Sequence, residues 1–145
     1  MFQRILVPLE HSVTDDVILE YIRHLARASQ ASLVLIHVAD GWVARNIHQL
    51  DLRESEEMKE DFGYLDRVST ELRHDGFKVE AVLAAGDPAR EIAAAADRER
   101  CDLIAMATHG HRYLNDMVRG SVASELRHRT MVPVLMVRGR PKESP

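Results

Sequence analysis

Glycine and hydroxyl residues in the last third of the chain have the types and spacing that bind anions. Gly110 is followed, after nine residues, by Gly120 and Ser121. Glycine lets the backbone approach a ligand closely, and serine can cap a helix or donate a hydrogen bond to a phosphate oxygen. Backbone N–H groups at a helix start attract negative charge. The segment therefore predicts a phosphate site, with Arg112 and Arg119 as charged contacts.

The same residues also suit a purely structural role. Gly120 and Ser121 can simply end a loop and cap the helix that follows, as these residue types often do. The Gly-Lys-Ser/Thr ending of a Walker P-loop is missing from this segment. On residue types alone, the structural role is slightly favoured over phosphate binding.

Histidines form a second group able to do chemistry. His11, His109 and His111 follow predicted strands, and with Glu10 they have the types that a transition metal accepts. Because the chain holds eight histidines, such coincidences arise easily. We expect solvated or phosphate-facing histidines here rather than a metal site. His37, near a strand end, is expected to have its hydrogen bonds satisfied.

The elements that must position these residues alternate between strand and helix. Strands are predicted at residues 5–9, 33–38, 77–83, 102–107 and 134–137. The run at 5–9 is continuously apolar, as is typical of a parallel strand covered by helices on both faces. Apolar spacing and cap signals predict helices at 14–28, 52–75, 88–100 and 122–129, with Gly76 after the second. Ser12 and Asp15 resemble a capping box, and Asp87 is an N-cap before Pro88. Residues 39–51 and 108–121 are predicted to be long connections.

This alternation predicts one open, five-stranded parallel sheet with helices on both faces, a Rossmann-like α/β sandwich. Ligands of such sheets bind at the carboxyl ends of the strands, where the strand order reverses. The rule directs attention to residues 8–12, 38–42, 84–87 and 108–121. We assign residues 1–138 to one domain and 139–145 to a flexible polar tail.

Composition narrows the classes of partner. The 145 residues include 19 Lys and Arg against 23 Asp and Glu, a net charge of −4, and 5% aromatic residues, which argues against a nucleic-acid partner. No apolar stretch approaches the roughly 18 residues of a membrane span. The lone Cys101 cannot form an internal disulfide, is expected to be packed rather than reactive, and fits a reducing compartment. We therefore expect a cytoplasmic protein without a membrane partner.

Several segments together resemble the universal stress protein family. They are Met106-Ala107-Thr108-His109-Gly110, Gly120-Ser121-Val122-Ala123 and residues 132–137, supported by residues 5–9, 86–88 and 101–104. The resemblance covers essentially the whole chain. It implies a five-stranded sheet of the adenine nucleotide α-hydrolase-like type and a homodimer. It also implies, for one branch, ATP binding through a Gly-x2-Gly-x9-Gly-Ser/Thr loop.

The resemblance carries a nucleotide site onto this chain. Gly110, Gly120 and Ser121 match the loop, whereas Ala107 replaces its first glycine. Glu10 stands where an aspartate is implied to contact the ribose or the metal that accompanies the phosphates, and His11 follows where glycine is usual. Val38 is implied to line the adenine pocket through its backbone, with Pro8 and Leu9 as its floor. The full expected set is Pro8, Leu9, Glu10, Val38, Ala107, Thr108, His109, Gly110, Arg112, Gly120, Ser121 and Val122. The ligand is ATP or another adenine nucleotide, with or without Mg.

Three functions follow from these residues. The first is a regulatory module that binds an adenine nucleotide, since the chain has no recognisable catalytic motif and no lysine near the predicted phosphate loop. The second is a dimeric stress-response scaffold without nucleotide, motivated by Ala107 and by Glu10-His11. The third is slow ATP hydrolysis or self-phosphorylation on Ser121 or Thr108. For assembly, we expect the last strand, with Val134, Leu135, Met136 and Val137, to lie at a sheet edge and pair with its copy.

Overall fold

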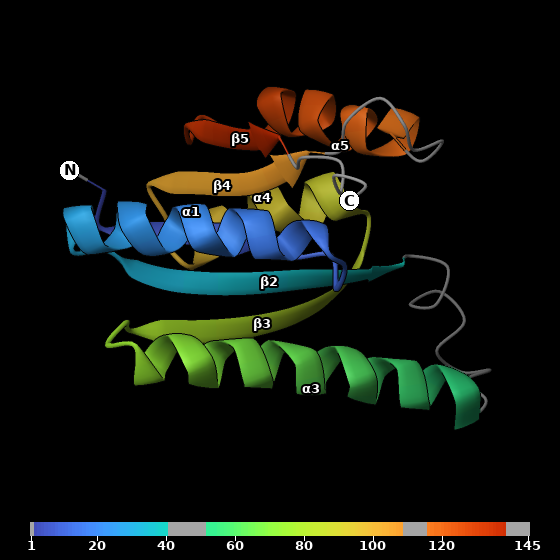
Figure 1. Ribbon diagram of the computed structural model, residues 1–145. Coiled ribbons are helices and arrows are strands. Elements are labelled where there is room, and N and C mark those ends of the chain that lie inside the picture. Colours follow the sequence, from blue (N-terminus) through green and yellow to red (C-terminus); the bar gives the residue numbers. More distant parts are fainter. Residues whose placement is uncertain (1, 41–51, 109–115, 139–145) are drawn as a thin grey trace, which may run out of the picture.

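The computed structural model describes residues 2–40, 52–108 and 116–138, in which strands and helices alternate. The strands are β1 (Arg4–Pro8), β2 (Ser32–Asp40), β3 (Val79–Gly86), β4 (Leu103–Thr108) and β5 (Val134–Arg138). The helices are α1 (Thr14–Ser29), α3 (Leu52–His74), α4 (Pro88–Arg98) and α5 (Asp116–Arg129). All strand pairs are parallel and the sheet order is β3-β2-β1-β4-β5, so the predicted five-stranded α/β fold is confirmed (Figure 1). β5 lies at one edge, as predicted.

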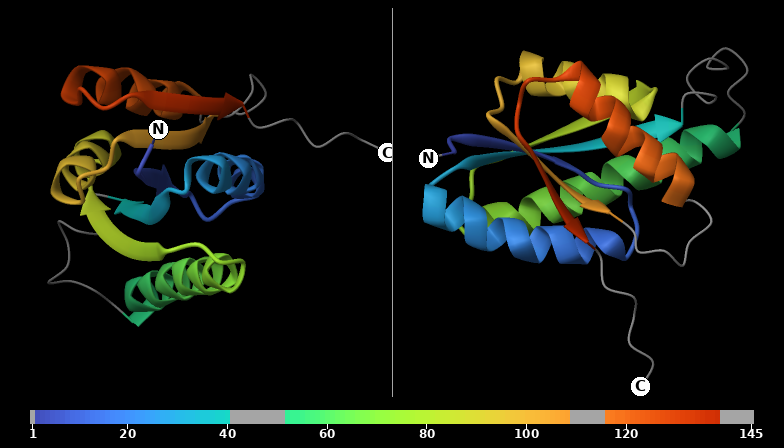
Figure 2. Two further views of the ribbon diagram at one scale, coloured as in Figure 1. Left: turned by 90° about the vertical axis from the view of Figure 1, so that its left-hand side faces the viewer. Right: turned by 90° about the horizontal axis from the view of Figure 1, so that it is seen from above.

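The sheet is the middle of three layers. α1 and α3 cover one face, and α4 and α5 cover the other (Figure 2). The side chains of β1 alternate between these two cores: Ile5 and Val7 pack toward α1, and Leu6 packs toward α4. All three side chains have 0% exposure. Burial on both faces explains why the strand is a continuous apolar run rather than an alternating one.

The chain changes direction beside β1. The first three strands run outward in the order β1, β2, β3, and the chain then returns to place β4 on the other side of β1. Ile5 is therefore level with Leu33 of β2 and with Leu103 of β4. The connections that leave β1 and β4 diverge to opposite faces, and this reversal opens the carboxyl edge of the sheet to a ligand.

The N-caps of two helices can be compared with the sequence prediction. The cap of α4 agrees with it, and the cap of α1 agrees only in part. Asp87 is the N-cap of α4, its carboxylate accepts a hydrogen bond from Arg90 N at 3.1 Å, and Pro88 occupies the first turn, as predicted. The capping box at α1 is only half formed. Val13 is the N-cap and makes no side-chain cap bond, whereas Asp15 accepts a hydrogen bond from Ser12 N at 3.3 Å.

Two other boundaries differ from the prediction. β3 begins at Val79 and extends to Gly86, because β2 is longer than predicted and its Asp40 pairs with Gly86. α5 begins at Asp116 rather than near residue 122, so Gly120 lies inside a helix and the predicted cap at Ser121 is wrong. Glycine within a helix costs about 1 kcal/mol relative to alanine, which is why the sequence favoured a loop there.

No helix in the part of the chain that the structure describes has the length and apolar character needed to cross a membrane.

Candidate functional site

The candidate site lies at the carboxyl ends of β1, β2 and β4. Pro8 ends β1 and is level with Ile36 of β2, two residues before Val38. Thr108 ends β4 on the other side of β1. Pro8, Val38 and Thr108 are all half-buried, so three of the predicted nucleotide contacts stand at one edge of the sheet with part of their surface accessible.

The turn after β1 is organised around one buried carboxylate. Asp15, only 1% exposed, accepts hydrogen bonds from the backbone N–H groups of Glu10 at 2.9 Å, His11 at 2.8 Å and Ser12 at 3.3 Å. It also accepts the hydroxyl of Tyr64 on α3 at 2.7 Å. A row of successive N–H groups forms an anion-binding concavity. Here the chain's own carboxylate fills that concavity, so these N–H groups are already bonded within the chain.

His11 is the residue on which this turn depends. Its φ is +63°, a left-handed conformation that is uncommon for residues with a side chain. Its ring stacks on Tyr64, with centroids 4.2 Å apart and planes 14° apart. Its Nδ1 lies 2.8 Å from Asp61 Oδ1. These contacts, together with the Asp15 bond, hold the turn in a conformation that the backbone alone disfavours.

His37 has a hydrogen-bond partner, as predicted, and a carboxylate within ion-pair distance. Its Nδ1 lies 2.9 Å from the carbonyl oxygen of Leu9, and its Nε2 lies 3.3 Å from Asp61 Oδ2. Asp61 on α3 therefore lies between His37 of β2 and His11 of the turn. Helix α3 is thus linked directly to the ends of the first two strands.

Glu10, the predicted ribose contact, faces the first turn of α1. Its Oε2 accepts a hydrogen bond from the Thr14 hydroxyl at 3.1 Å and lies 3.5 Å from the Ser12 hydroxyl. A ribose hydroxyl would share this carboxylate with Thr14. The half-buried position of Glu10 leaves part of it accessible for that role.

Leu9 and Val38 belong to opposite faces of the sheet. Leu9 is 3% exposed and packs in the core beneath α1, whereas Val38 packs against the core beneath α4 and α5. A ligand lying over Val38 would therefore meet the backbone of Leu9 rather than its side chain. Ala107 packs against the α1-side core, and Val122 of α5 packs against the other.

Part of the predicted phosphate loop lies outside the described residues. His109, Gly110 and Arg112 fall there, as does His111. The backbone of Gly120 and Ser121 is within α5, in its second turn. Among the residues that the structure does describe, no group of three or more His, Cys, Asp or Glu is arranged to hold a metal ion.

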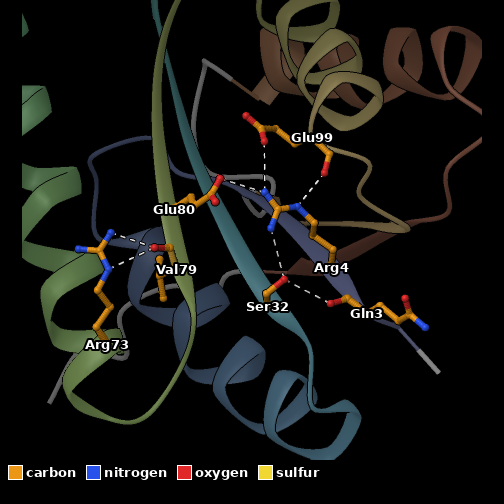
Figure 3. A network of polar contacts seen from close by, with 7 residues as sticks. All are labelled: Gln3, Arg4, Ser32, Arg73, Val79, Glu80 and Glu99. Atoms are coloured by element: carbon orange, nitrogen blue, oxygen red, sulfur yellow. Dashed lines mark hydrogen bonds and ion pairs between the residues drawn. The ribbon is translucent and has the colours of Figure 1, made fainter.

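A cavity of about 410 Å³ opens at the opposite edge, by the amino ends of β1, β2 and β3. Its arginines already have partners (Figure 3). Arg4 Nη2 lies 2.9 Å from Glu80 Oε2 and 3.2 Å from Glu99 Oε2, and Arg73 donates to the Val79 carbonyl at 2.9 Å. Ligands of open parallel sheets bind at the carboxyl ends. We therefore interpret these contacts as structural, because they join strands and helices at the amino ends of the strands.

Comparison with known proteins decides the family. The family model for the universal stress protein family matches residues 1–138. The chain belongs to the universal stress protein family. Universal stress protein YxiE of Bacillus subtilis is 30% identical over 148 residues, which cover 95% of this chain and 100% of the relative. Universal stress protein MJ0577 of Methanocaldococcus jannaschii is 26% identical over 158 residues, which cover 95% and 96%.

Solved structures of universal stress proteins share the fold. The structure of MJ0577 matches with a TM-score of 0.83 at 26% identity and covers 99% of each chain. A universal stress protein from Archaeoglobus fulgidus, solved in complex with dAMP, has a TM-score of 0.67 at 20% identity and covers 93% of this chain and 97% of that one. A universal stress protein solved in complex with cAMP has a TM-score of 0.70 at 18% identity, covering 96% and 98%.

The structure explains one departure from the universal stress protein pattern described above. The resemblance implies glycine at the position that His11 occupies, and glycine is the residue that adopts a positive φ without strain. In this chain His11 has a left-handed backbone, which contacts with Asp15, Asp61 and Tyr64 stabilise. Asp15, Asp61 and Tyr64 were missed as functional residues. Only Asp15 carried a sequence signal, through the incomplete capping box.

Proposed function

We propose that this chain is a regulatory module that binds an adenine nucleotide at the carboxyl ends of β1, β2 and β4. The observation that carries the proposal is the position of Pro8, Val38 and Thr108, which stand partly accessible where the strand order reverses. Two structures of the same fold were solved with dAMP and cAMP, which supports an adenine nucleotide as the ligand class.

The geometry favours one orientation of the nucleotide. Asp15 fills the row of N–H groups after β1, so the phosphates are expected beside β4 and the start of α5. There we propose contacts from Thr108, His109, Gly110 and Arg112, and from Gly120, Ser121 and Val122. Ala107 precedes them at the end of β4. The adenine then lies by the backbone of Val38 and Leu9, and Glu10 contacts the ribose.

Two features of the chain fit this ligand. The dipole of α5 provides a positive helix end toward the β4 side of the edge, and such ends bind phosphate without a net positive protein. For Mg, the proposed ribose contact Glu10 already accepts a hydrogen bond from Thr14. We therefore propose a nucleotide held mainly by backbone groups, with any Mg carried by the phosphates.

A regulatory role fits better than catalysis. The polar side chains described at the carboxyl ends of the strands contact one another. Asp15 accepts hydrogen bonds from three backbone N–H groups and from Tyr64, and Asp61 lies 2.8 Å from His11 Nδ1 and 3.3 Å from His37 Nε2. We propose that these groups fix the backbone rather than act on a phosphoryl group. We propose that the nucleotide acts by ordering the phosphate-side segment and so changing a partner surface.

Titration calorimetry tests this proposal. ATP, ADP and AMP are titrated into folded protein, and binding is expected for at least one. A protein that stays folded and gives no heat at millimolar nucleotide contradicts the proposal and favours a scaffold that binds no nucleotide. Turnover of ATP that is lost in Ser121→Ala would instead favour the slow ATPase.

For assembly, we propose a homodimer through β5. This strand is at the sheet edge, and its Met136 is 44% exposed. An apolar edge strand tends to pair with another chain. Light scattering at micromolar concentration is expected to give the dimer mass for the wild type and the monomer mass for Met136→Lys. A monomeric wild type contradicts this part of the proposal.

A further inference from the structure

Glu10, the proposed ribose contact, is held by two consecutive residues of α1. The hydroxyl of Thr14 donates to its side-chain Oε2 at 3.1 Å, and the carboxylate of Asp15 accepts its backbone N–H at 2.9 Å. The preceding residue is fixed separately, because Leu9 N donates to the carbonyl oxygen of Ile36 in β2 at 2.8 Å. The position of the Glu10 carboxylate therefore depends on the first turn of α1.

The carboxylate of Asp15 is buried and is fully used in hydrogen bonds within the chain. It is 1% exposed. Among the described residues it accepts four hydrogen bonds, three from the consecutive N–H groups of residues 10–12 and one from the Tyr64 hydroxyl. A carboxylate offers about four lone pairs. We therefore expect Asp15 to act on the site through the turn and not by contact with a ligand.

The four bonds are divided unequally between the two oxygens of Asp15. Oδ1 accepts the N–H of Glu10, whereas Oδ2 accepts the N–H groups of His11 and Ser12 and the hydroxyl of Tyr64. The amide of asparagine has one oxygen and one NH2 group, and the NH2 group cannot accept. With the amide oxygen in the place of Oδ2, the NH2 group faces the Glu10 N–H, donor against donor. The opposite orientation loses three bonds, so Asp15→Asn is expected to lose the bond to Glu10.

We propose that Asp15 is a positioning residue that sets the Glu10 carboxylate for the ribose hydroxyls and so gives the site a preference for ribonucleotides. The inference rests on the proposed nucleotide site and adds a determinant of specificity to it. A site that places a charged acceptor for a hydroxyl binds the analogue without that hydroxyl less tightly, because the hydrogen bond is lost. The preference is therefore only as strong as the placement of Glu10.

The backbone of the turn needs the support of Asp15. His11, directly after Glu10, has a φ of +63°, which is uncommon for a residue with a side chain. Its N–H donates to Asp15 at 2.8 Å. Without this acceptor the turn is expected to sample more conformations, and the nucleotide must select the ordered one, which weakens binding.

The test compares AMP with 2′,3′-dideoxy-AMP, which has the same base and phosphate but lacks both ribose hydroxyls. Val38 and Thr108, proposed to lie near the base and the phosphate, belong to β2 and β4 and not to this turn. Both ligands report those contacts, whereas only AMP reports the ribose contact. Titration calorimetry of the full chain gives the two dissociation constants. In the wild type we expect AMP to bind about tenfold more tightly than the dideoxy analogue.

Asp15→Asn is the test variant. We expect the preference for AMP to fall to about twofold, through weaker AMP binding and with the affinity for dideoxy-AMP almost unchanged. Asp15→Ser is the second variant, in case the asparagine variant does not fold. Its short side chain forces no donor against Glu10 and leaves room for water to bind the released N–H groups. The same loss of preference is expected.

Two control variants separate positioning from general effects. Asp16→Asn removes the exposed carboxylate of the next residue and is expected to keep the wild-type preference. Val79→Ala truncates a buried side chain at the amino end of β3. It is expected to lower the stability of the fold and to leave the preference unchanged.

A double-mutant cycle tests whether Asp15 acts through Glu10. Glu10→Gln is expected to weaken AMP binding by itself. Adding Asp15→Asn to it is then expected to weaken AMP binding no further, because the placed carboxylate is already gone. A further loss of the same size as in the wild-type background would show that Asp15 acts elsewhere and would overturn the proposal.

The outcomes also separate this proposal from the proposed function. A reduced preference for AMP in the folded Asp15 variants, with the preference kept in both controls, supports the positioning role. If the folded Asp15 variants keep the wild-type preference, or if Val79→Ala reduces it equally, the positioning role is wrong and the nucleotide site stands. If the wild type binds neither ligand, the proposed nucleotide site itself is wrong, and the positioning role falls with it.

Discussion

Tyr64 donates its hydroxyl hydrogen to Asp15 Oδ2 across 2.7 Å, and this bond joins the middle of α3 to the first turn of α1. Burial, followed by the hydrogen bond to Asp15, raises the pKa of the Tyr64 hydroxyl well above its ordinary value. Tyr64 therefore remains protonated, and a hydrogen-bond donor, at neutral pH. Its carboxylate partner also holds the turn after β1, so this contact links core packing to the proposed site.

Tyr64→Phe tests the strength of that contact. The substitution keeps the ring that stacks on His11 and removes only the hydroxyl, leaving Asp15 with three N–H donors. We expect the free energy of unfolding to fall by about 1–2 kcal/mol in urea denaturation. Tyr21→Phe, at a tyrosine that is 54% exposed on α1, is the control and is expected to have little effect. Equal stability of the two variants would contradict the assignment.

Alanine substitutions at two glycines are expected to change the stability of the protein in opposite directions. Gly86 has a φ of +135°, and an added Cβ would lie 3.0 Å from Glu91 Oε1. Gly86→Ala is therefore expected to cost about 1–2 kcal/mol. Gly63 lies within α3 with no atom within 4 Å of an added Cβ, so Gly63→Ala is expected to stabilise by about 0.5–1 kcal/mol. Thermal unfolding of both variants checks the pair, and a change of the same sign in both would contradict it.

Ser69 on α3 has a buried hydroxyl that lacks a hydrogen-bond partner within the described residues, at 1% exposure. An unsatisfied buried polar group is destabilising, and alanine is the better helix former. Ser69→Ala is expected to raise the free energy of unfolding by about 0.5–1 kcal/mol, measured in urea. A loss of stability would mean that the hydroxyl makes a bond after all.

Cys101 is expected to be chemically inert in the folded protein. Burial raises the pKa of its thiol to about 11, and the side chain is 6% exposed. The thiolate thus forms more readily in the unfolded chain, so this group's contribution to stability is lost as the pH rises from about 8.5 toward the folded value. At pH 8.5, alkylation by iodoacetamide is expected to be about 100-fold slower in native protein than in denaturant. Mass spectrometry checks this, and equal rates would contradict the burial.

The fold was predictable because its signals are local. Strands such as β1 and β4 are buried on both faces and appear as unbroken apolar runs, and Asp87-Pro88 marks the start of α4 with residues that cap helices anywhere. The start of α5 was not predictable in the same way. Gly120 lowers the helix propensity of that segment, whereas the structure extends the helix through it.

The contacts behind the site could not be predicted from the sequence. Asp61 and Tyr64 lie about fifty residues from His11 and Asp15 along the chain, and only the packing of α3 beside α1 brings them together. Their spacing on α3 is also what an ordinary half-buried helix face would show. The positions of the predicted contacts Pro8, Val38 and Thr108 could be predicted, because ligands of such sheets bind at the carboxyl ends of the strands.

Amide chemical shifts measured as AMP is added to labelled protein test the central claim most directly. We predict that the largest changes occur at the carboxyl edge, at Glu10, Val38 and Thr108, and that Arg4 and Ser32 at the amino edge change little. Changes centred on Arg4 and Ser32, or no changes at millimolar AMP, would contradict the account.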